Sequence, residues 1–368
     1  MLRRISLAAI LALFLAALLA WWWWSAPPVD KPATLVAAMR HVPASAEGAV
    51  VLGEPSRFAR WIARHPMSLG LLLVADPGAA SLRSRFRPLA LATARAASGP
   101  IVVWWQQNDL AVGVDVNEGS RRALSEVAAT EGFAAEPFGN GVAIASMPTL
   151  FGQEGNAAPP EIPGGHIAAL GHVAGRWWWV RAHSNRLEAV TGTPPELPAP
   201  GGVSRIETTD AGALLAPVAA FGRELAGPFR LVISGEQGWG LALPTATLPE
   251  RLRRMLSGVR AGGTTPGEPQ EWNGVLGRLW SMPGPGVTLA TRRDLLPALA
   301  GGATSTEEGN ITGADAAWAL RRLAAAAAYV PFLDRQTKEL RAAAAAAGTL
   351  RRARWRIGPA GGHIELEW

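Results

Sequence analysis

The chain has 368 residues, a formal net charge of +6 and no cysteine. The missing cysteines exclude disulfides, thiol catalysis and cysteine-ligated zinc or iron–sulfur sites. Hydrophobic residues make up 49% of the chain and charged residues 17%, a balance that excludes a disordered protein and can fill the cores of two ordinary domains.

The N-terminus predicts a membrane anchor. Arg3 and Arg4 precede an unbroken apolar run over residues 5–24. A helix of that length spans about 30 Å, the thickness of a bilayer core, and the two cations mark its cytoplasmic end. We therefore expect a transmembrane signal-anchor over residues 1–24 of a single-pass protein in the inner (cytoplasmic) membrane of a bacterium, with the C-terminal bulk periplasmic. Four tryptophans would lie at the membrane interface: Trp21, Trp22, Trp23 and Trp24.

A cleaved signal peptide is the alternative, although its apolar core is usually only about 7–15 residues long. Cleavage after Ala20 would leave a mature chain that begins with the tryptophans. Cleavage after Ala26 would leave Pro27 directly beyond the cut bond, where it is unfavourable. These features favour an uncleaved anchor.

The rest of the chain divides at proline- and glycine-rich segments. We expect a stalk over residues 25–40, a first module over 41–192, a linker over 193–202 and a second module over 203–368. A pattern of one helix followed by a β-hairpin recurs, with the helices expected at residues 80–98, 210–226 and 315–347. Residues 179–192 and 288–301 also match in pattern, each as a strand that enters a short helix. The prediction is an α+β fold of two related modules, whose antiparallel sheets are packed by helices.

Two local patterns are specific enough to predict pairings. In the hairpin over residues 351–368, Arg352, Arg354 and Arg356 should face Glu367, Glu365 and His363. In the hairpin over residues 101–116, a turn at Asn108-Asp109 would pair Trp105 with Val112 and place Trp104 opposite Gly113. Thr312 and Asp315 fit the start of a helix.

The segment Val42-Pro43-Ala44-Ser45-Ala46, which leads into a strand at 49–52, resembles the start of domains in a group of uncharacterised bacterial proteins. Those proteins have an N-terminal signal-anchor followed by tandem α+β domains of unknown function. The resemblance implies the same architecture here and supplies no catalytic residue.

Candidate sites are few. In Trp177-Trp178-Trp179, the middle ring of a strand would face away from the outer two, so Trp177 and Trp179 are the predicted binding surface, with burial on both faces as the alternative. A turn at Ala174-Gly175 would place His172 opposite Trp177 and His166 opposite His183, a pattern that surface histidines explain as well as a metal does. We predict no metal site, cofactor or catalytic residue, because no hydrolase, zinc-protease, P-loop or dinucleotide motif is present.

The functional prediction is a membrane-anchored, extracytoplasmic binding protein of the bacterial envelope that is not an enzyme and that engages another envelope protein. A carrier or sensor of an apolar ligand such as a lipid is the alternative, and an envelope hydrolase with an unrecognised site is less favoured. No nucleic-acid partner is expected, because no binding motif for one is present.

Overall fold

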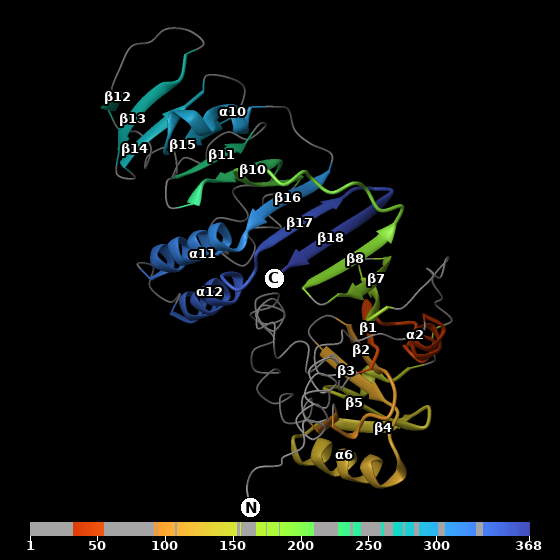
Figure 1. The fold of residues 1–368 in the computed structure, drawn as a ribbon. Coiled ribbons are helices and arrows are strands. Elements are labelled where there is room, and N and C mark those ends of the chain that lie inside the picture. The colour runs from red at the N-terminus through yellow and green to blue at the C-terminus, as the bar shows by residue number, and fades with distance from the viewer. Residues whose placement is uncertain are drawn as a thin grey trace, which may run out of the picture. The chain divides into compact units, whose positions relative to one another are not determined.

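In the computed structural model, the chain forms two compact units (Figure 1). Unit 1 comprises Met1–His65 and Gly78–Ala189, and unit 2 comprises Pro66–Pro77 and Val190–Trp368. The structure describes residues 32–54, 92–93, 95–106, 109–152, 155, 167–173, 175–183, 185–209, 227–235, 238–243, 259–260, 268–274, 277–282, 287–300, 306–328 and 334–368.

The described strands of unit 1 pair antiparallel in one order across the sheet. That order is β4 (Ala134–Phe138), β5 (Gly141–Ala145), β3 (Asp109–Val114), β2 (Ile101–Gln106), β1 (Gly48–Leu52), β6 (Ala169–Val173) and β7 (Arg176–Ala182). In β1 the buried residues Ala49 and Val51 lie on one face and the partly buried Val50 and Leu52 on the other, and all five residues of β5 are buried, so both faces of the sheet carry apolar packing.

Helices cover parts of both faces of the unit 1 sheet. Helix α6 (Glu118–Thr130) begins where the Asn117 side chain accepts a hydrogen bond from the Ser120 N–H, and it packs Leu124 and Ala128 into a core with β2, β3 and β5. Helix α2 (Pro32–Met39) contacts β1 and β6, and its core residues are Leu35, Val36 and Met39. Residues 32–39, expected within an extended stalk, are therefore helical and partly buried.

The described strands of unit 2 also pair antiparallel throughout. Their order is β18 (Gly361–Glu367), β17 (Arg352–Ile357), β16 (Glu307–Thr312), β9 (Ser204–Thr208), β10 (Phe229–Ile233), β11 (Trp239–Leu243), β15 (Val287–Ala290), β14 (Gly277–Ser281), β13 (Gln270–Gly274) and β12 (Val259–Arg260). The helices α11 (Gly313–Ala327) and α12 (Asp334–Ala347) pack against each other, and α11 joins a core with β10, β16 and β17. The short helix α10 (Leu296–Leu299) packs on β10, β11 and β15.

The two units repeat one strand order. The strands β5, β3, β2, β1, β6 and β7 of unit 1 correspond to β15, β11, β10, β9, β16 and β17 of unit 2. In each unit a central strand pairs with a hairpin on one side and with a second strand pair on the other. A β6–β7 turn in unit 1 is replaced by the helix pair α11–α12 in unit 2.

Two local features align the repeat residue by residue. Ser146 follows β5 in unit 1, and its hydroxyl accepts a hydrogen bond from the Leu110 N–H at 3.0 Å. Thr291 follows β15 in unit 2, and its hydroxyl accepts one from the Trp239 N–H at 2.9 Å. Their own N–H groups donate to the carbonyls of the same two residues at 2.9 Å. A 3-10 turn with a buried leucine follows both, Leu150 in unit 1 and Leu295 in unit 2.

The second feature is a glycine that lies directly opposite a tryptophan on the neighbouring strand. Gly171 pairs with Trp178 in unit 1, and Gly309 pairs with Trp355 in unit 2. A Cβ on Gly309 would lie 2.2 Å from the Trp355 ring, so a side chain there would displace the indole. Both features give the same alignment, in which Val50 corresponds to Ile206.

The predicted α+β class is wrong. Among the described residues, strand makes up 44% and helix 27%, and the strands pair antiparallel, so this part of the protein is mostly antiparallel β. The short helix predicted at the end of residues 179–192 is wrong, because residues Arg186–Gly192 form strand β8. Residues 287–300 instead form β15, a 3-10 turn and α10, so the pattern match between residues 179–192 and 288–301 is also wrong.

The register of the β2–β3 hairpin differs from the prediction by two residues. Trp105 pairs with Leu110, because Gln106 and Asp109 already belong to the ladder. Trp104 therefore lies opposite Ala111, and the Phe138 ring covers Gly113 instead. The C-terminal hairpin has the predicted register, with Arg352 opposite Glu367.

The structure does not support the predicted single-pass protein of the inner membrane. Among the described residues, no helix combines the length and apolar character needed to cross a bilayer. Even α11, with 15 residues, rises only about 22 Å against a hydrocarbon core of about 30 Å. The predicted signal-anchor over residues 1–24, with its interface tryptophans, lies outside the described residues.

Candidate interaction surface on the second unit

A row of charged side chains crosses the sheet of unit 2. Directly opposite residues of antiparallel strands share one face, so the register places this row on a single face. Its members, from β10 to β18, are Arg230, Glu207, Glu308, Arg356 and His363. We call these five residues the charged row.

The corresponding row of unit 1 is apolar. The residues that align with the first four members of the charged row are Val102, Val51, Leu170 and Trp179. The first three are fully buried and Trp179 is 7% exposed. The same backbone arrangement therefore accepts an apolar row, and the fold itself does not require the charges of unit 2.

Arg230 and Glu207 form the buried end of the charged row. The Arg230 Nε donates to Glu207 Oε1 at 2.8 Å and Nη2 donates to Oε2 at 3.3 Å, which makes the pair bidentate. The remaining guanidinium nitrogen donates to the carbonyls of Leu299 (2.9 Å) and Ala300 (2.8 Å), at the C-terminus of α10. Arg205, on the same strand as Glu207, also pairs with this carboxylate.

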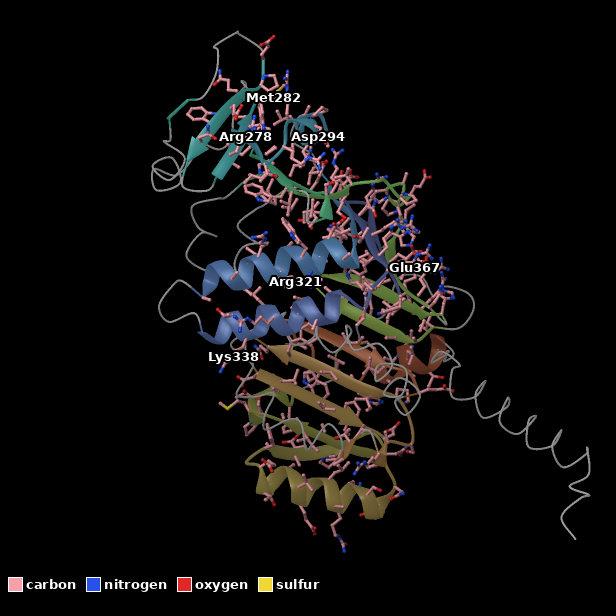
Figure 2. All side chains as sticks on the ribbon, turned by 60° about the vertical axis from the view of Figure 1, so that its left-hand side comes forward. Arg278, Met282, Asp294, Arg321, Lys338 and Glu367 are labelled. Atoms are coloured by element: carbon pink, nitrogen blue, oxygen red, sulfur yellow. The ribbon has the colours of Figure 1, made fainter. Side chains whose placement is uncertain are left out.

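The partly exposed end of the charged row also contains an ion pair, with a single hydrogen bond. Arg356 donates from Nε to Glu308 at 2.9 Å. Glu207 and Glu308 face each other across β9 and β16, and the paired arginines offset the repulsion between their carboxylates. The neighbouring row on this face continues the pattern, with Arg354 donating to Glu365 at 3.1 Å. Figure 2 labels Glu367 on the same hairpin, at its open end.

An extended segment lies on this face. Residues 193–202, which we call the strap, connect β8 to β9 (Figure 1). Arg356 donates from Nη1 to the carbonyl of Glu196 at 2.7 Å, and Asn310 donates from Nδ2 to the carbonyl of Ala199 at 3.4 Å. The Nδ1 of His363 lies 3.3 Å from the carbonyl of Pro195. We call the face of the unit 2 sheet that carries the charged row the charged face. Its side chains therefore hold the strap by the backbone carbonyls.

Two polar atoms beside the strap remain unused. Asn310 is 7% exposed, and its Oδ1 has no hydrogen-bond partner among the described residues. The same is true of the Nε of Arg205, which pairs with Asn310 across β9 and β16. Both atoms are inaccessible to solvent, so the strap leaves one buried acceptor and one buried donor of this face without a partner among the described residues.

The two predicted binding tryptophans are on one face, as their alternation implied. Trp179 is 7% exposed and belongs to the apolar row, so it offers little area to a partner. Trp177 is partly buried, and its ring lies 4.7 Å from that of His172, its predicted cross-strand partner. Whether these rings bind a ligand stays a prediction.

The predicted pairing of His166 with His183 involves a residue outside the described part of the chain. Within the described ranges, no group of three or more histidine, aspartate or glutamate side chains converges as a metal site would need.

Sequence analysis missed Arg230, Glu207 and Asn310 as candidate site residues. A charged residue inside an apolar strand such as Phe-Arg-Leu-Val-Ile was the available signal. That signal gains meaning only once the partner strand is known, because Arg230 and Glu207 are 23 residues apart in the chain.

A comparison of this chain with protein-family models, with curated proteins and with solved structures finds no match.

Proposed function

We propose that this chain is a non-enzymatic interaction protein and that the charged face of unit 2 binds an extended segment of a partner polypeptide by its backbone. The observation that carries the proposal is the strap, which this face holds through the carbonyls of Pro195, Glu196 and Ala199.

The chemistry of the strap suits this mode of recognition. Proline has no N–H group and favours an extended, unpaired backbone, so a proline-rich segment presents carbonyl acceptors at little cost in conformational entropy. Arginine, asparagine and histidine supply the matching donors. The aligned apolar row of unit 1 supports a role beyond folding for the charges, since buried ion pairs seldom add net stability over apolar residues.

The test uses the full-length chain with its strap prolines, Pro194, Pro195, Pro198 and Pro200, replaced by serine. A synthetic peptide of residues 192–202 is then titrated into this strap variant by calorimetry. Serine removes the preference of the tethered strap for an extended backbone and so weakens its competition for the face. We therefore expect the peptide to bind the strap variant about tenfold or more tightly than it binds the unaltered chain.

Adding Asn310→Ala and Arg356→Ala to the strap variant should remove most of this binding. The matched control is Arg351→Ala, an exposed arginine of the same hairpin whose partner is Glu367. The proposal would be refuted if the folded strap variant did not bind the peptide, or if it bound the peptide equally well after Asn310→Ala and Arg356→Ala were added.

A further inference from the structure

Arg352 is an arginine of the charged face that has no carboxylate of its own. Strand alternation places it on the same face of β17 as Arg354 and Arg356. Glu367 lies directly opposite Arg352 on β18, but its carboxylate accepts a hydrogen bond from Nη1 of Arg351 at 2.9 Å. Among the described residues, Arg352 forms no ion pair, whereas the other arginines of this face on β9, β10 and β17 each pair with a glutamate: Arg205, Arg230, Arg354 and Arg356.

The guanidinium of Arg352 is partly withdrawn from water. Its Nε is buried without a hydrogen-bond partner among the described residues, whereas its Nη atoms are not buried. A charged group in this position opposes folding, because it loses part of its contact with water and gains no acceptor in return. The two Nη atoms form the end of the guanidinium that pairs with a carboxylate in a bidentate manner, and this end stays available.

The strap passes close to the row of Arg352 at its C-terminal end. After the carbonyl of Ala199, which is held by the charged face, the strap continues to Ser204 at the start of β9. The Ser204 hydroxyl accepts a hydrogen bond from the Thr312 N–H at 3.0 Å, and Thr312 lies directly opposite Arg352. Residues 200–202 of the strap therefore approach the row that contains Arg352.

This end of the strap offers space for a side chain but no acceptor. Residues 200–202 are Pro-Gly-Gly, and all three are exposed. A Cβ on Gly202 would have no atom within 4 Å, and a Cβ on Gly201 would meet only the backbone of Val203, at 3.8 Å or more. The one carboxylate of the strap, that of Glu196, belongs to its N-terminal half. The strap therefore leaves the cation beside its C-terminal end unpaired.

We propose that Arg352 selects partner segments that carry an aspartate or glutamate at the position of Gly201 or Gly202. This inference rests on the proposed function, because the partner segment follows the path of the strap. The carbonyl contacts hold the backbone of the segment whatever its sequence, and Arg352 adds a charge-assisted pair with the carboxylate. The class of partner is thus an extended, proline-containing segment with an acidic residue toward its C-terminal end.

The experiment titrates synthetic peptides of residues 192–202 into the full-length strap variant by calorimetry. Two peptides carry Gly201→Glu or Gly202→Glu, and two matched peptides carry glutamine at the same positions. All four end in an amide, so that no terminal carboxylate takes the place of the side chain. The test chain adds Arg352→Gln to the strap variant, and the matched control adds Arg278→Gln, an exposed arginine of β14 that pairs with Glu271. Circular dichroism checks that both chains are folded.

We expect at least one glutamate peptide to bind the strap variant about fivefold or more tightly than its glutamine counterpart. Arg352→Gln should remove this difference and leave the binding of the glutamine peptides unchanged, whereas Arg278→Gln should preserve it. The inference is wrong if glutamate gives no advantage, or if the advantage persists after Arg352→Gln. In either case the proposed function still stands as long as the peptides bind through Asn310 and Arg356. If none of the four peptides bound, the proposed function itself would be refuted, and this inference with it.

Discussion

The two units fill the same positions of one strand arrangement with opposite chemistry. Where unit 1 aligns Val102, Val51 and Leu170 across three strands, unit 2 aligns Arg230, Glu207 and Glu308. The ladder fixes which side chains meet, and it leaves open whether they meet as apolar groups or as ion pairs. A hydrophobic row gains free energy from each buried side chain, about 1.5–3 kcal/mol, whereas buried ion pairs lose most of their attraction to desolvation.

The largest expected effect on stability comes from a substitution of Glu207. In the variant Glu207→Ala, Arg230 stays buried without its carboxylate, and the free energy of unfolding should fall by about 3–5 kcal/mol. Denaturant unfolding measures the loss, and amide hydrogen exchange in β9 and β10 localises it to unit 2.

The double variant Glu207→Val with Arg230→Val gives unit 2 the chemistry of unit 1 at these positions. We expect it to be far more stable than the single variant, close to the unaltered chain or above it. If the double variant unfolded as readily as Glu207→Ala, the alignment of the two rows would be wrong.

The next largest expected effect is the difference in stability loss between alanine substitutions at one aligned position of the two units. Leu170→Ala in unit 1 removes a fully buried side chain and should cost about 2–5 kcal/mol. Its counterpart Glu308→Ala removes one member of a partly exposed ion pair, with side-chain exposures of 25% for Glu308 and 32% for Arg356, and should cost about 1 kcal/mol or less. Paired thermal unfolding curves test this, and equal losses would contradict the contrast.

The smallest effect tests the repeat itself. Ser146→Ala and Thr291→Val each remove a hydroxyl that accepts a hydrogen bond from a strand N–H. Each change should cost about 0.5–1.5 kcal/mol, and exchange of the amide hydrogen of Leu110 or Trp239 should accelerate in the matching unit. A protected amide after substitution would show that the two bonds are not equivalent.

Local sequence patterns predicted local structure well where several signals agreed. The register of the C-terminal hairpin followed from alternating charges, because a slip of one residue would bury them. The start of α11 followed from Thr312, whose hydroxyl accepts the Asp315 N–H at 3.1 Å. At residues 179–192, by contrast, a pattern match to residues 288–301 was the main signal, and the predicted short helix is strand β8 in the folded chain.

The sequence by itself determined the alternation of the C-terminal hairpin and the start of α11. Only the tertiary structure decided that β9 lies between β10 and β16, and thus that Glu207 meets both Arg230 and Glu308. Partners separated by 23 residues or more leave no periodic signal in the chain, because each strand carries only its own alternation. The charged row and the strap on it therefore exist only once the strands have paired.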